Sequence, residues 1–188
     1  MIVLNKQSQY YRWHVITDLM PESGELRGAE VGVWKGECAR HLLGMMPGLT
    51  LLMVDTWAPA RAGDRYHQSR DSKAIASQAE HDAALSMAQE VAGNSEGRGI
   101  IRQGASVEVA LSVDADSLDF VFIDADHTAE GVAEDIGAWI GKVKPGGIIA
   151  GHDFGRYGVE AGVKRMIGGA FHLSHDTTWW HRVRKGLR

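Results

Sequence analysis

The sequence predicts an α/β fold built on a mostly parallel sheet, and two kinds of segment support this prediction. First, short apolar runs end abruptly in acids: LLMVD ends at Asp55 and FVFID ends at Asp124. Such short runs, rich in β-branched and aromatic residues, are typical of strands that are buried on both faces of a parallel sheet. Second, the segment AEVGVWKGE combines a short strand with a glycine turn, and residues at helical spacing follow it. Alternation of strands with helices indicates the α/β class.

Length and composition fit one globular domain, which we expect to span residues 1–188, with an N-terminal helix in 1–26 and the core in 27–188. A formal net charge of -4 argues against a nucleic-acid-binding surface. The single cysteine, Cys38, excludes an intramolecular disulfide and fits a reducing compartment. The sequence shows no signal-peptide pattern and no apolar run of membrane-spanning length. We therefore expect a cytoplasmic protein without nucleic-acid or membrane partners, and leave open whether it forms a homo-oligomer.

The N-terminal part of the chain predicts one helix and one strand. Aromatic and apolar residues from Tyr10 to Met20 predict an amphipathic helix that ends near Pro21, and we expect its aromatic face to pack on the sheet rather than overhang a pocket. A short strand is expected from Ala29 to Val33, with a helix after the following glycine turn.

An acid before the glycine turn and another at the next strand end predict a nucleoside site. A glycine turn lets a ligand approach backbone N–H groups closely. Glu30 would repel a pyrophosphate but suits an ammonium or sulfonium group, although it could instead pair with Arg27 or Lys35. Asp55 follows about twenty residues later, the spacing at which an acid accepts hydrogen bonds from ribose hydroxyls.

The middle of the chain predicts a covering segment, a helix and a third strand. Residues 57–70 show no periodicity, and we interpret them as a mobile substrate cover, with an ordinary solvated loop as the alternative. A third strand is expected at Gly99–Gln103, followed by helical residues Val107 to Leu111. Between the covering segment and this third strand, apolar residues recur at helical spacing at Ala79, Ala83, Met87 and Val91, which predicts a helix.

The segment LDFVFIDADHT predicts the reaction centre, because a buried strand ends there in Asp124, Asp126 and His127. Ligands of open α/β sheets bind beyond the carboxyl ends of the strands. The alternative for Asp126 and His127 is that they belong to the start of a helix that Thr128 caps. That helix is expected over residues 128–144.

The C-terminal part predicts one more strand over residues 148–150, which ends in Gly151-His152-Asp153. A helix is expected over residues 158–167. Two closing strands are expected over residues 171–173 and 178–183, and of the adjacent Trp179 and Trp180 only one can face inward.

These motifs together resemble the class I S-adenosylmethionine-dependent methyltransferases, and among them the small-molecule O-methyltransferases of macrolide-sugar and catechol type. Glu30-Val31-Gly32-Val33-Trp34-Lys35-Gly36 matches the acidic-x-Gly-x-Gly-x-Gly motif, with Trp34 in place of the middle glycine. FIDADHTAEGVAEDI and VKPGGIIAGHDF are similar to the fourth- and fifth-strand signatures, and the resemblance covers about Arg27 to Arg184. It implies a Rossmann-like, doubly wound sheet of seven strands, mostly parallel, with helices on both faces and a C-terminal antiparallel β-hairpin.

The resemblance also implies the roles of individual residues. Those expected to bind S-adenosylmethionine are Glu30, Gly32, Gly36, Asp55, Thr56, Ala105, Ser106 and Asp124. The expected catalytic residues are Asp124, His127 and His152, and the expected metal ligands are Asp124, His152 and Asp153.

The predicted reaction is methyl transfer to a hydroxyl of a small molecule, and such an acceptor needs a base or a metal to lose its proton. Oxygen ligands favour Mg²⁺, but His152 stands where a second oxygen ligand is expected. Mg²⁺, another divalent cation such as Mn²⁺, Fe²⁺ or Zn²⁺, and no metal therefore remain alternatives, with His127 or His152 as the base. The alternative functions are a nicotinamide-dependent oxidoreductase on a Rossmann core and a non-catalytic nucleoside-binding protein.

Overall fold

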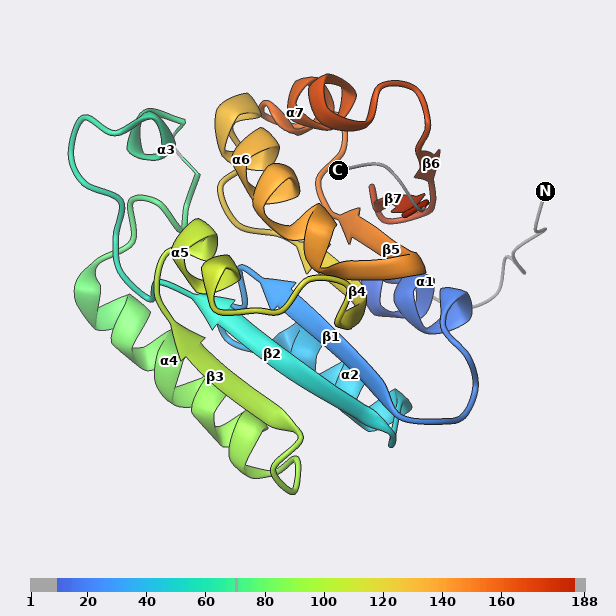
Figure 1. Ribbon diagram of the computed structural model, residues 1–188. Coiled ribbons are helices and arrows are strands. Elements are labelled where there is room, and N and C mark those ends of the chain that lie inside the picture. The colour runs from blue at the N-terminus through green and yellow to red at the C-terminus, as the bar shows by residue number, and fades with distance from the viewer. Residues whose placement is uncertain (1–9, 70, 185–188) are drawn as a thin grey trace.

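A seven-stranded sheet runs through the computed structural model, which describes residues 10–69 and 71–184 (Figure 1). The strand order is β3-β2-β1-β4-β5-β7-β6, with β1 to β5 parallel and the β6–β7 hairpin antiparallel. The predicted fold class is therefore confirmed. The strands are β1 Leu26–Val31, β2 Leu49–Asp55, β3 Gly99–Gln103, β4 Leu118–Ile123, β5 Val143–Gly151, β6 His172–Leu173 and β7 Trp179–Arg182.

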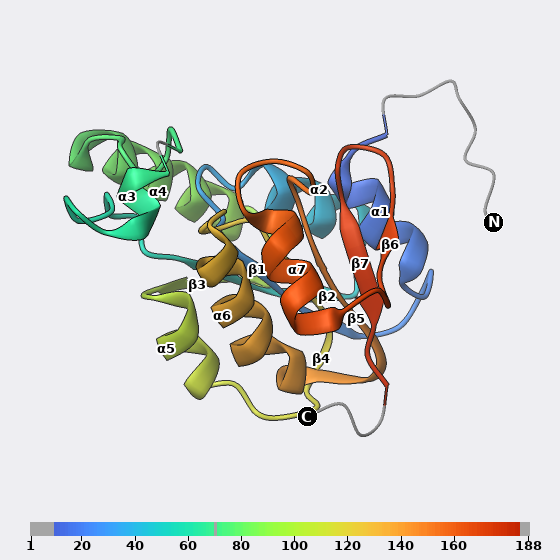
Figure 2. The same cartoon turned by 90° about the horizontal axis from the view of Figure 1, so that it is seen from above.

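Helices cover both faces of the sheet (Figure 2). The core on one face joins the sheet to α1, α2 and α4, and the core on the other joins it to α5, α6 and α7. Each face therefore has its own continuous apolar layer, as a doubly wound fold requires. The helices are α1 Arg12–Leu19, α2 Glu37–Met45, α3 Arg65–Gln68, α4 Gln78–Gly93, α5 Ser106–Leu111, α6 Ala129–Trp139 and α7 Val159–Ile167.

The strand order reverses between β1 and β4, which lie side by side and parallel at the centre of the sheet. Their register pairs Glu30 with Phe122 and Val31 with Ile123. The two strands therefore end at the same level, and the connections that leave them diverge to opposite sides. Such a switch point opens a crevice beyond the carboxyl ends of the strands, and both segments that the sequence singles out arrive there.

Several boundaries differ from the predictions. Helix α1 begins at Arg12 and ends, as expected, just before Pro21. Strand β1 covers Leu26–Val31 rather than Ala29 to Val33, because Gly32 adopts φ +91° and ends the extended backbone. Helix α6 stops at Trp139 rather than continuing to Lys144. A 3₁₀ turn, η1 Ile140–Lys142, follows it, and β5 already begins at Val143.

The connection between β2 and α4 also differs from expectation. The prediction of a mobile cover over residues 57–70 is wrong for Trp57, which is only 1% exposed and belongs to the core between the sheet, α2 and α4. Within the same connection, residues 65–68 form the one-turn helix α3. The face that α4 buries differs from the predicted apolar set and consists of His81, Ala84 and Ala88.

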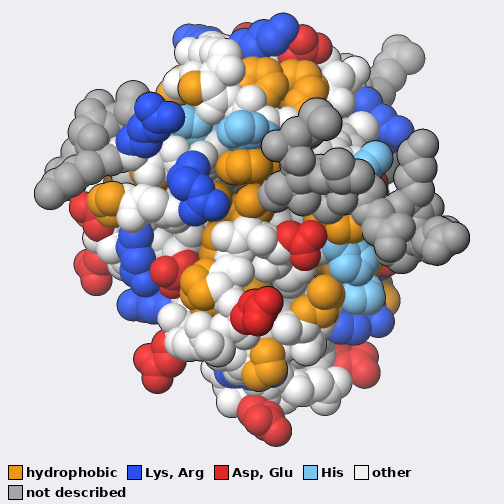
Figure 3. Space-filling model, turned by 90° about the vertical axis from the view of Figure 1, so that its right-hand side faces the viewer, with side chains coloured by type: hydrophobic (Ala, Val, Ile, Leu, Met, Phe, Trp, Pro, Cys, Tyr) orange, Lys and Arg blue, Asp and Glu red, His pale blue; other side chains and the backbone are white. Residues whose placement is uncertain are grey.

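The C-terminal hairpin matches the prediction, since Trp179 is buried and Trp180 is only partly buried. Within the described part of the chain, no helix is both long and apolar enough to cross a membrane. Acidic and basic side chains are interspersed over the visible face in Figure 3, which agrees with a small net charge.

Candidate active site

A cavity of about 1000 Å³ opens at the carboxyl ends of the parallel strands. Its size falls in the range of ligand pockets. Gly36 lies away from it, at the N-cap of α2 with φ +78°, where it packs against α4. The other predicted site residues line it: Glu30, Gly32, Asp55, Thr56, Ala105, Ser106, Asp124, His127, His152 and Asp153.

The glycine turn after β1 packs tightly against the end of β4. A Cβ on Gly32 would lie 2.2 Å from the carbonyl oxygen of Asp124, so only glycine fits at this position. Trp34 stands where the family motif has a glycine, and it adopts φ +50°. Its N–H donates to Asp55 Oδ2 at 2.8 Å, and its carbonyl accepts from Trp57 Nε1 at 2.8 Å. These two hydrogen bonds fix the unusual backbone of the tryptophan, and the Trp57 N–H, which donates to Asp55 Oδ1 at 2.9 Å, holds Asp55 in turn.

Glu30 is a buried carboxylate at the end of β1, 2% exposed. Among the described residues its Oε2 atom has no hydrogen-bond partner, and it forms no ion pair with Arg27 or Lys35. Burial raises its pKa well above the ordinary value, and the charge of Asp124 adds to this, while Arg12 opposes it. A cationic ligand in the cavity would satisfy this oxygen, since an unpartnered buried polar atom is costly.

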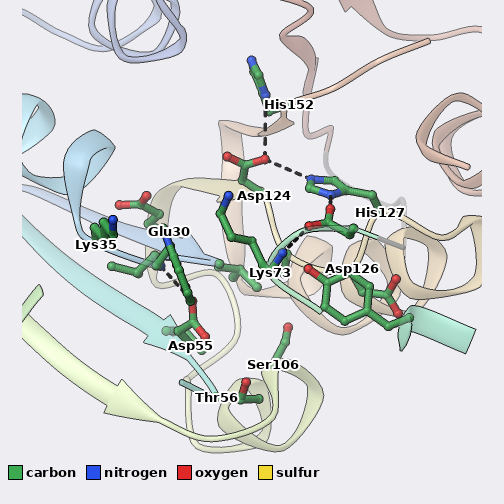
Figure 4. A pocket seen from close by; sticks show the side chains of 18 of the residues that line it. Glu30, Lys35, Asp55, Thr56, Lys73, Ser106, Asp124, Asp126, His127 and His152 are labelled. Atoms are coloured by element: carbon green, nitrogen blue, oxygen red, sulfur yellow. Dashed lines mark hydrogen bonds and ion pairs between the residues drawn. The ribbon is translucent and has the colours of Figure 1, made fainter. Parts of the chain in front are cut away.

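The predicted reaction centre assembles at the ends of β4 and β5, where His127 and His152 both point toward the carboxylate of Asp124 (Figure 4). His127 Nε2 lies 3.2 Å from Asp124 Oδ1 and 3.6 Å from Asp153 Oδ2. His152 Nδ1 lies 3.8 Å from Asp124 Oδ1 and 3.3 Å from Asp153 Oδ1. The hydrogen bond from His152 lowers the pKa of Asp153 to about 2. The four side chains thus form one compact group of two carboxylates and two imidazoles.

Asp71, which the sequence interpretation missed, completes the surroundings of His127. Its Oδ2 lies 2.6 Å from His127 Nδ1, and both side chains are buried. Tyr157 stacks on the imidazole with ring centroids 5.5 Å apart. Burial alone lowers the pKa of His127, but hydrogen bonds with Asp124 and Asp71 outweigh burial and raise this pKa to about 10.

Arg12 of α1 is a second residue that the sequence interpretation missed. Its Nη1 lies 2.5 Å from Asp124 Oδ2, and its backbone N–H donates to Asp176 Oδ2 at 3.0 Å. The other carboxylate oxygen of Asp176 lies 3.4 Å from His152 Nε2. Helix α1 is thereby tied both to the end of β4 and to the β6–β7 turn, and it both packs on the sheet and borders the cavity. No local pattern in the sequence marks Asp71 or Arg12 as a residue of the site.

Two predicted positions have structural tasks as well. Asp126 Oδ1 accepts from the N–H of Thr128 at 2.8 Å, and the hydroxyl of Thr128 accepts from Gly131 N at 3.1 Å, so the capping alternative holds for Asp126. His127 instead contacts Asp71 and Asp124. Ser106 lines the cavity, but its hydroxyl accepts from Trp139 Nε1 at 2.8 Å. A backbone contact from Ser106 to a ligand is compatible with this hydrogen bond.

The donor atoms of the reaction centre fit a divalent cation. Asp124, His152 and Asp153 each offer one ligand atom, and these atoms lie within 4.8 Å of one another. Two carboxylates and an imidazole suit Mn²⁺, Fe²⁺ or Zn²⁺ at least as well as Mg²⁺. This is the set of metal ligands that the sequence predicts.

A sequence-family model described as a methyltransferase domain matches residues 29–154, which carry the glycine turn, Asp55 and both strand ends of the reaction centre. The chain belongs to this family, the class I S-adenosylmethionine-dependent methyltransferases. The resemblance seen in the sequence is thus confirmed, and the match gives no support to the nicotinamide alternative. No curated protein matches the chain.

Solved structures share the fold at low sequence identity. The O-methyltransferase NovP is 17% identical with a TM-score of 0.61, and the match covers 91% of this chain and 75% of NovP. A methyltransferase from Geobacter sulfurreducens is 12% identical with a TM-score of 0.58, and the match covers 92% and 76% of the two chains. The chain spans only 42% and 50% of the length of two further matching structures.

Proposed function

We propose that the protein transfers the methyl group of S-adenosylmethionine to a hydroxyl group of a small molecule. The observation that carries this proposal is the single cavity that joins the two ends of the site. At one end are the glycine turn, Asp55 and the unpartnered oxygen of Glu30, and at the other is the cluster of carboxylates and imidazoles at Asp124. A volume of about 1000 Å³ has room for the cofactor and a small acceptor together.

The residues at the first end suit the cofactor by charge and by hydrogen bonding. Each carboxylate oxygen of Asp55 uses one lone pair on a backbone N–H and keeps another for a ribose hydroxyl. Glu30 suits the positively charged methionine part of the cofactor, because its buried oxygen lacks a partner among the described residues. The glycine turn lets the cofactor approach the backbone between them.

The residues at the second end suit an acceptor hydroxyl. In the proposed reaction a bond forms between the acceptor oxygen and the methyl carbon while the carbon–sulfur bond breaks. The hydroxyl proton passes to an imidazole, and S-adenosylhomocysteine leaves. His127 and His152 both face the space beside Asp124. His152 can take that proton, whereas the raised pKa of His127 keeps that imidazole protonated. The sulfonium donor is already activated, so the protein mainly aligns the two reactants and excludes water.

A divalent cation, if bound, would be held by Asp124, His152 and Asp153 and would lower the pKa of the acceptor hydroxyl. We include this metal in the proposal because the donor set fits it. Arg12 pairs with Asp124 Oδ2, whereas Asp124 Oδ1 faces the two imidazoles. Oδ1 is therefore available to a cation.

Calorimetric titration with S-adenosylhomocysteine tests the cofactor part of the proposal, run with Mn²⁺, with Mg²⁺ and with a chelator. We expect saturable micromolar binding that Asp55→Ala abolishes and Asp124→Asn retains. Transfer of a labelled methyl group to a panel of phenols and sugars then tests the acceptor class, and Asp124→Asn should abolish it. Absence of S-adenosylhomocysteine binding in all conditions would refute the proposal, and transfer only to amines would refute the hydroxyl acceptor.

A further inference from the structure

We propose that His127 is a fourth metal ligand of the reaction centre and that Asp71, from the connection between β2 and α4, positions it. This inference rests on the metal-assisted form of the proposed function. It adds one ligand to the predicted set, on the segment after β4, and one positioning residue, on a segment that covers the site. The other ligands would be Asp124, His152 and Asp153.

The distances between donor atoms carry the first step. Donor atoms of one cation with metal–ligand distances of about 2.1 Å lie about 3.0 to 3.4 Å apart in octahedral or tetrahedral geometry. His127 Nε2 lies 3.2 Å from Asp124 Oδ1 and 3.6 Å from Asp153 Oδ2. His152 Nδ1 lies 3.3 Å from Asp153 Oδ1 and 3.8 Å from Asp124 Oδ1. Each imidazole therefore has one contact at the spacing of neighbouring ligands, 3.2 Å for His127 and 3.3 Å for His152, and one longer contact to the other carboxylate, 3.6 and 3.8 Å.

The contact with Asp71 carries the second step. Asp71 is 4% exposed, and its Oδ1 accepts from the N–H of Lys73 at 2.8 Å while its Oδ2 lies 2.6 Å from His127 Nδ1. A carboxylate at this distance holds a proton on Nδ1, so a cation that binds His127 would replace the proton on Nε2. Metal-binding histidines are commonly oriented by such a carboxylate on their other nitrogen. The stacked ring of Tyr157 fixes the plane of the imidazole as well.

The position of Asp71 in the chain carries the third step. Asp71 is separated from His127 by 56 positions in the sequence and reaches it only because the connection between β2 and α4 folds over the cavity. Arg65 of the same connection pairs with Asp126, beside His127, at 3.4 Å. The covering segment therefore contacts the proposed metal centre directly, and its placement and metal binding should depend on each other. Two imidazoles in the donor set favour Mn²⁺, Fe²⁺ or Zn²⁺ over Mg²⁺.

The test is Mn²⁺ binding to the full chain, measured by calorimetry and by electron spin echo spectroscopy, which detects nitrogen atoms bound to the ion. We expect the wild type to show two coupled imidazole nitrogens, and His127→Gln to show one. His152→Gln should also leave one nitrogen, which would then be His127. Asp71→Asn should weaken Mn²⁺ binding about 10- to 100-fold, the usual cost of losing such an orienting group. S-adenosylhomocysteine affinity, measured on each variant, should not change.

The matched controls are His41→Gln, an exposed histidine of α2 that stacks on Trp13, and Asp82→Asn, an exposed acid that accepts from Gln78. Both should bind Mn²⁺ as the wild type does. Two nitrogens in His127→Gln, or none in His152→Gln, would overturn the ligand assignment. Unchanged Mn²⁺ affinity in Asp71→Asn would overturn the positioning role. If the wild type binds S-adenosylhomocysteine but not Mn²⁺, this inference fails while the methyltransferase function stands; if it binds neither, both fail.

Discussion

Replacing Asp55 by asparagine tests the part of the site on which cofactor binding depends. Both carboxylate oxygens accept a backbone N–H, Oδ2 from Trp34 at 2.8 Å and Oδ1 from Trp57 at 2.9 Å. An amide of the same shape offers one oxygen and one NH₂ group. Whichever way it turns, its NH₂ group faces one of these N–H donors, so that one hydrogen bond is lost and replaced by repulsion.

The size of the effect follows from these contacts. A hydrogen bond to a charged group contributes about 1.5 to 3 kcal/mol. The hydrogen bond that remains also weakens when the charge is removed. We therefore expect Asp55→Asn to lower the free energy of unfolding by about 2 to 4 kcal/mol. Losing one ribose acceptor and displacing the glycine turn should weaken S-adenosylhomocysteine binding at least about 10- to 100-fold, or about 1.4 to 2.7 kcal/mol.

Urea unfolding and calorimetric titration measure the two effects, and Asp119→Asn is the matched control. Asp119 also accepts a backbone N–H, from Arg27 at 2.8 Å, and it pairs with Lys144 at 2.7 Å, but it lies at the amino-terminal end of β4. Asp119→Asn should therefore lower the free energy of unfolding without changing the affinity for S-adenosylhomocysteine. Wild-type affinity in folded Asp55→Asn would refute the ribose role. An equal loss of affinity in Asp119→Asn would show that the effect comes from general destabilisation.

Four further substitutions have defined outcomes. Burial in α6 raises the pKa of Asp135 to about 7, so the folded state holds its proton more tightly than the unfolded state, and stability falls as pH rises from about 4 to about 7. In urea unfolding, the free energy of unfolding of the wild type should fall by up to about 4 kcal/mol relative to that of Asp135→Asn over this pH interval. A difference in stability between the two proteins that does not change with pH would contradict this. Gly32→Ala, with its Cβ 2.2 Å from a backbone oxygen at φ +91°, should cost about 2 to 5 kcal/mol and abolish cofactor binding. Gly44→Ala, with open space around it inside α2, should instead stabilise by about 0.5 to 1 kcal/mol. Arg12→Met removes the ion-pair partner of Asp124. It should lower the free energy of unfolding by about 1 to 2 kcal/mol and speed proteolysis at α1. Wild-type stability and wild-type proteolysis would show that this ion pair does not hold α1 in place.

The buried strands could be predicted because their sequence pattern is local. The apolar runs before Asp55 and Asp124 are unbroken and end in acids, and β2 and β4 lie where those runs lie. A local pattern also explains why the start of β5 could not be predicted. Val143 continues the helical spacing of α6, yet it is fully buried in the sheet opposite Leu118, so strand pairing outweighs the helical pattern there. Trp57 falls in the predicted cover because residues 57–70 show no periodicity, and only the tertiary structure shows that its side chain belongs to the core.

The strand-end residues of the site could be predicted for the same reason, whereas their partners could not. Residues that follow parallel strands must meet at one edge of the sheet, which is how Asp124, His127 and His152 come together. Arg12 reaches Asp124 across 112 positions of sequence and Asp71 reaches His127 across 56, and neither contact leaves a periodic or spacing signal. Such contacts depend on how the connections fold back over the sheet, and loops are where that information is weakest.

This division between strand ends and connections suggests where the properties of the enzyme are set. The register of β1 with β4 and of β4 with β5 fixes the spacing of the strand-end groups, and a change there would disturb the core. Arg12, Asp71 and Asp176 instead come from α1, the β2–α4 connection and the β6–β7 turn, and each contacts a strand-end residue through one or two polar atoms. We expect changes at these three residues to alter the acceptor side of the cavity at a smaller cost to the fold than changes in strand register. We therefore expect acceptor choice to follow the covering segments and cofactor binding to follow the strand ends.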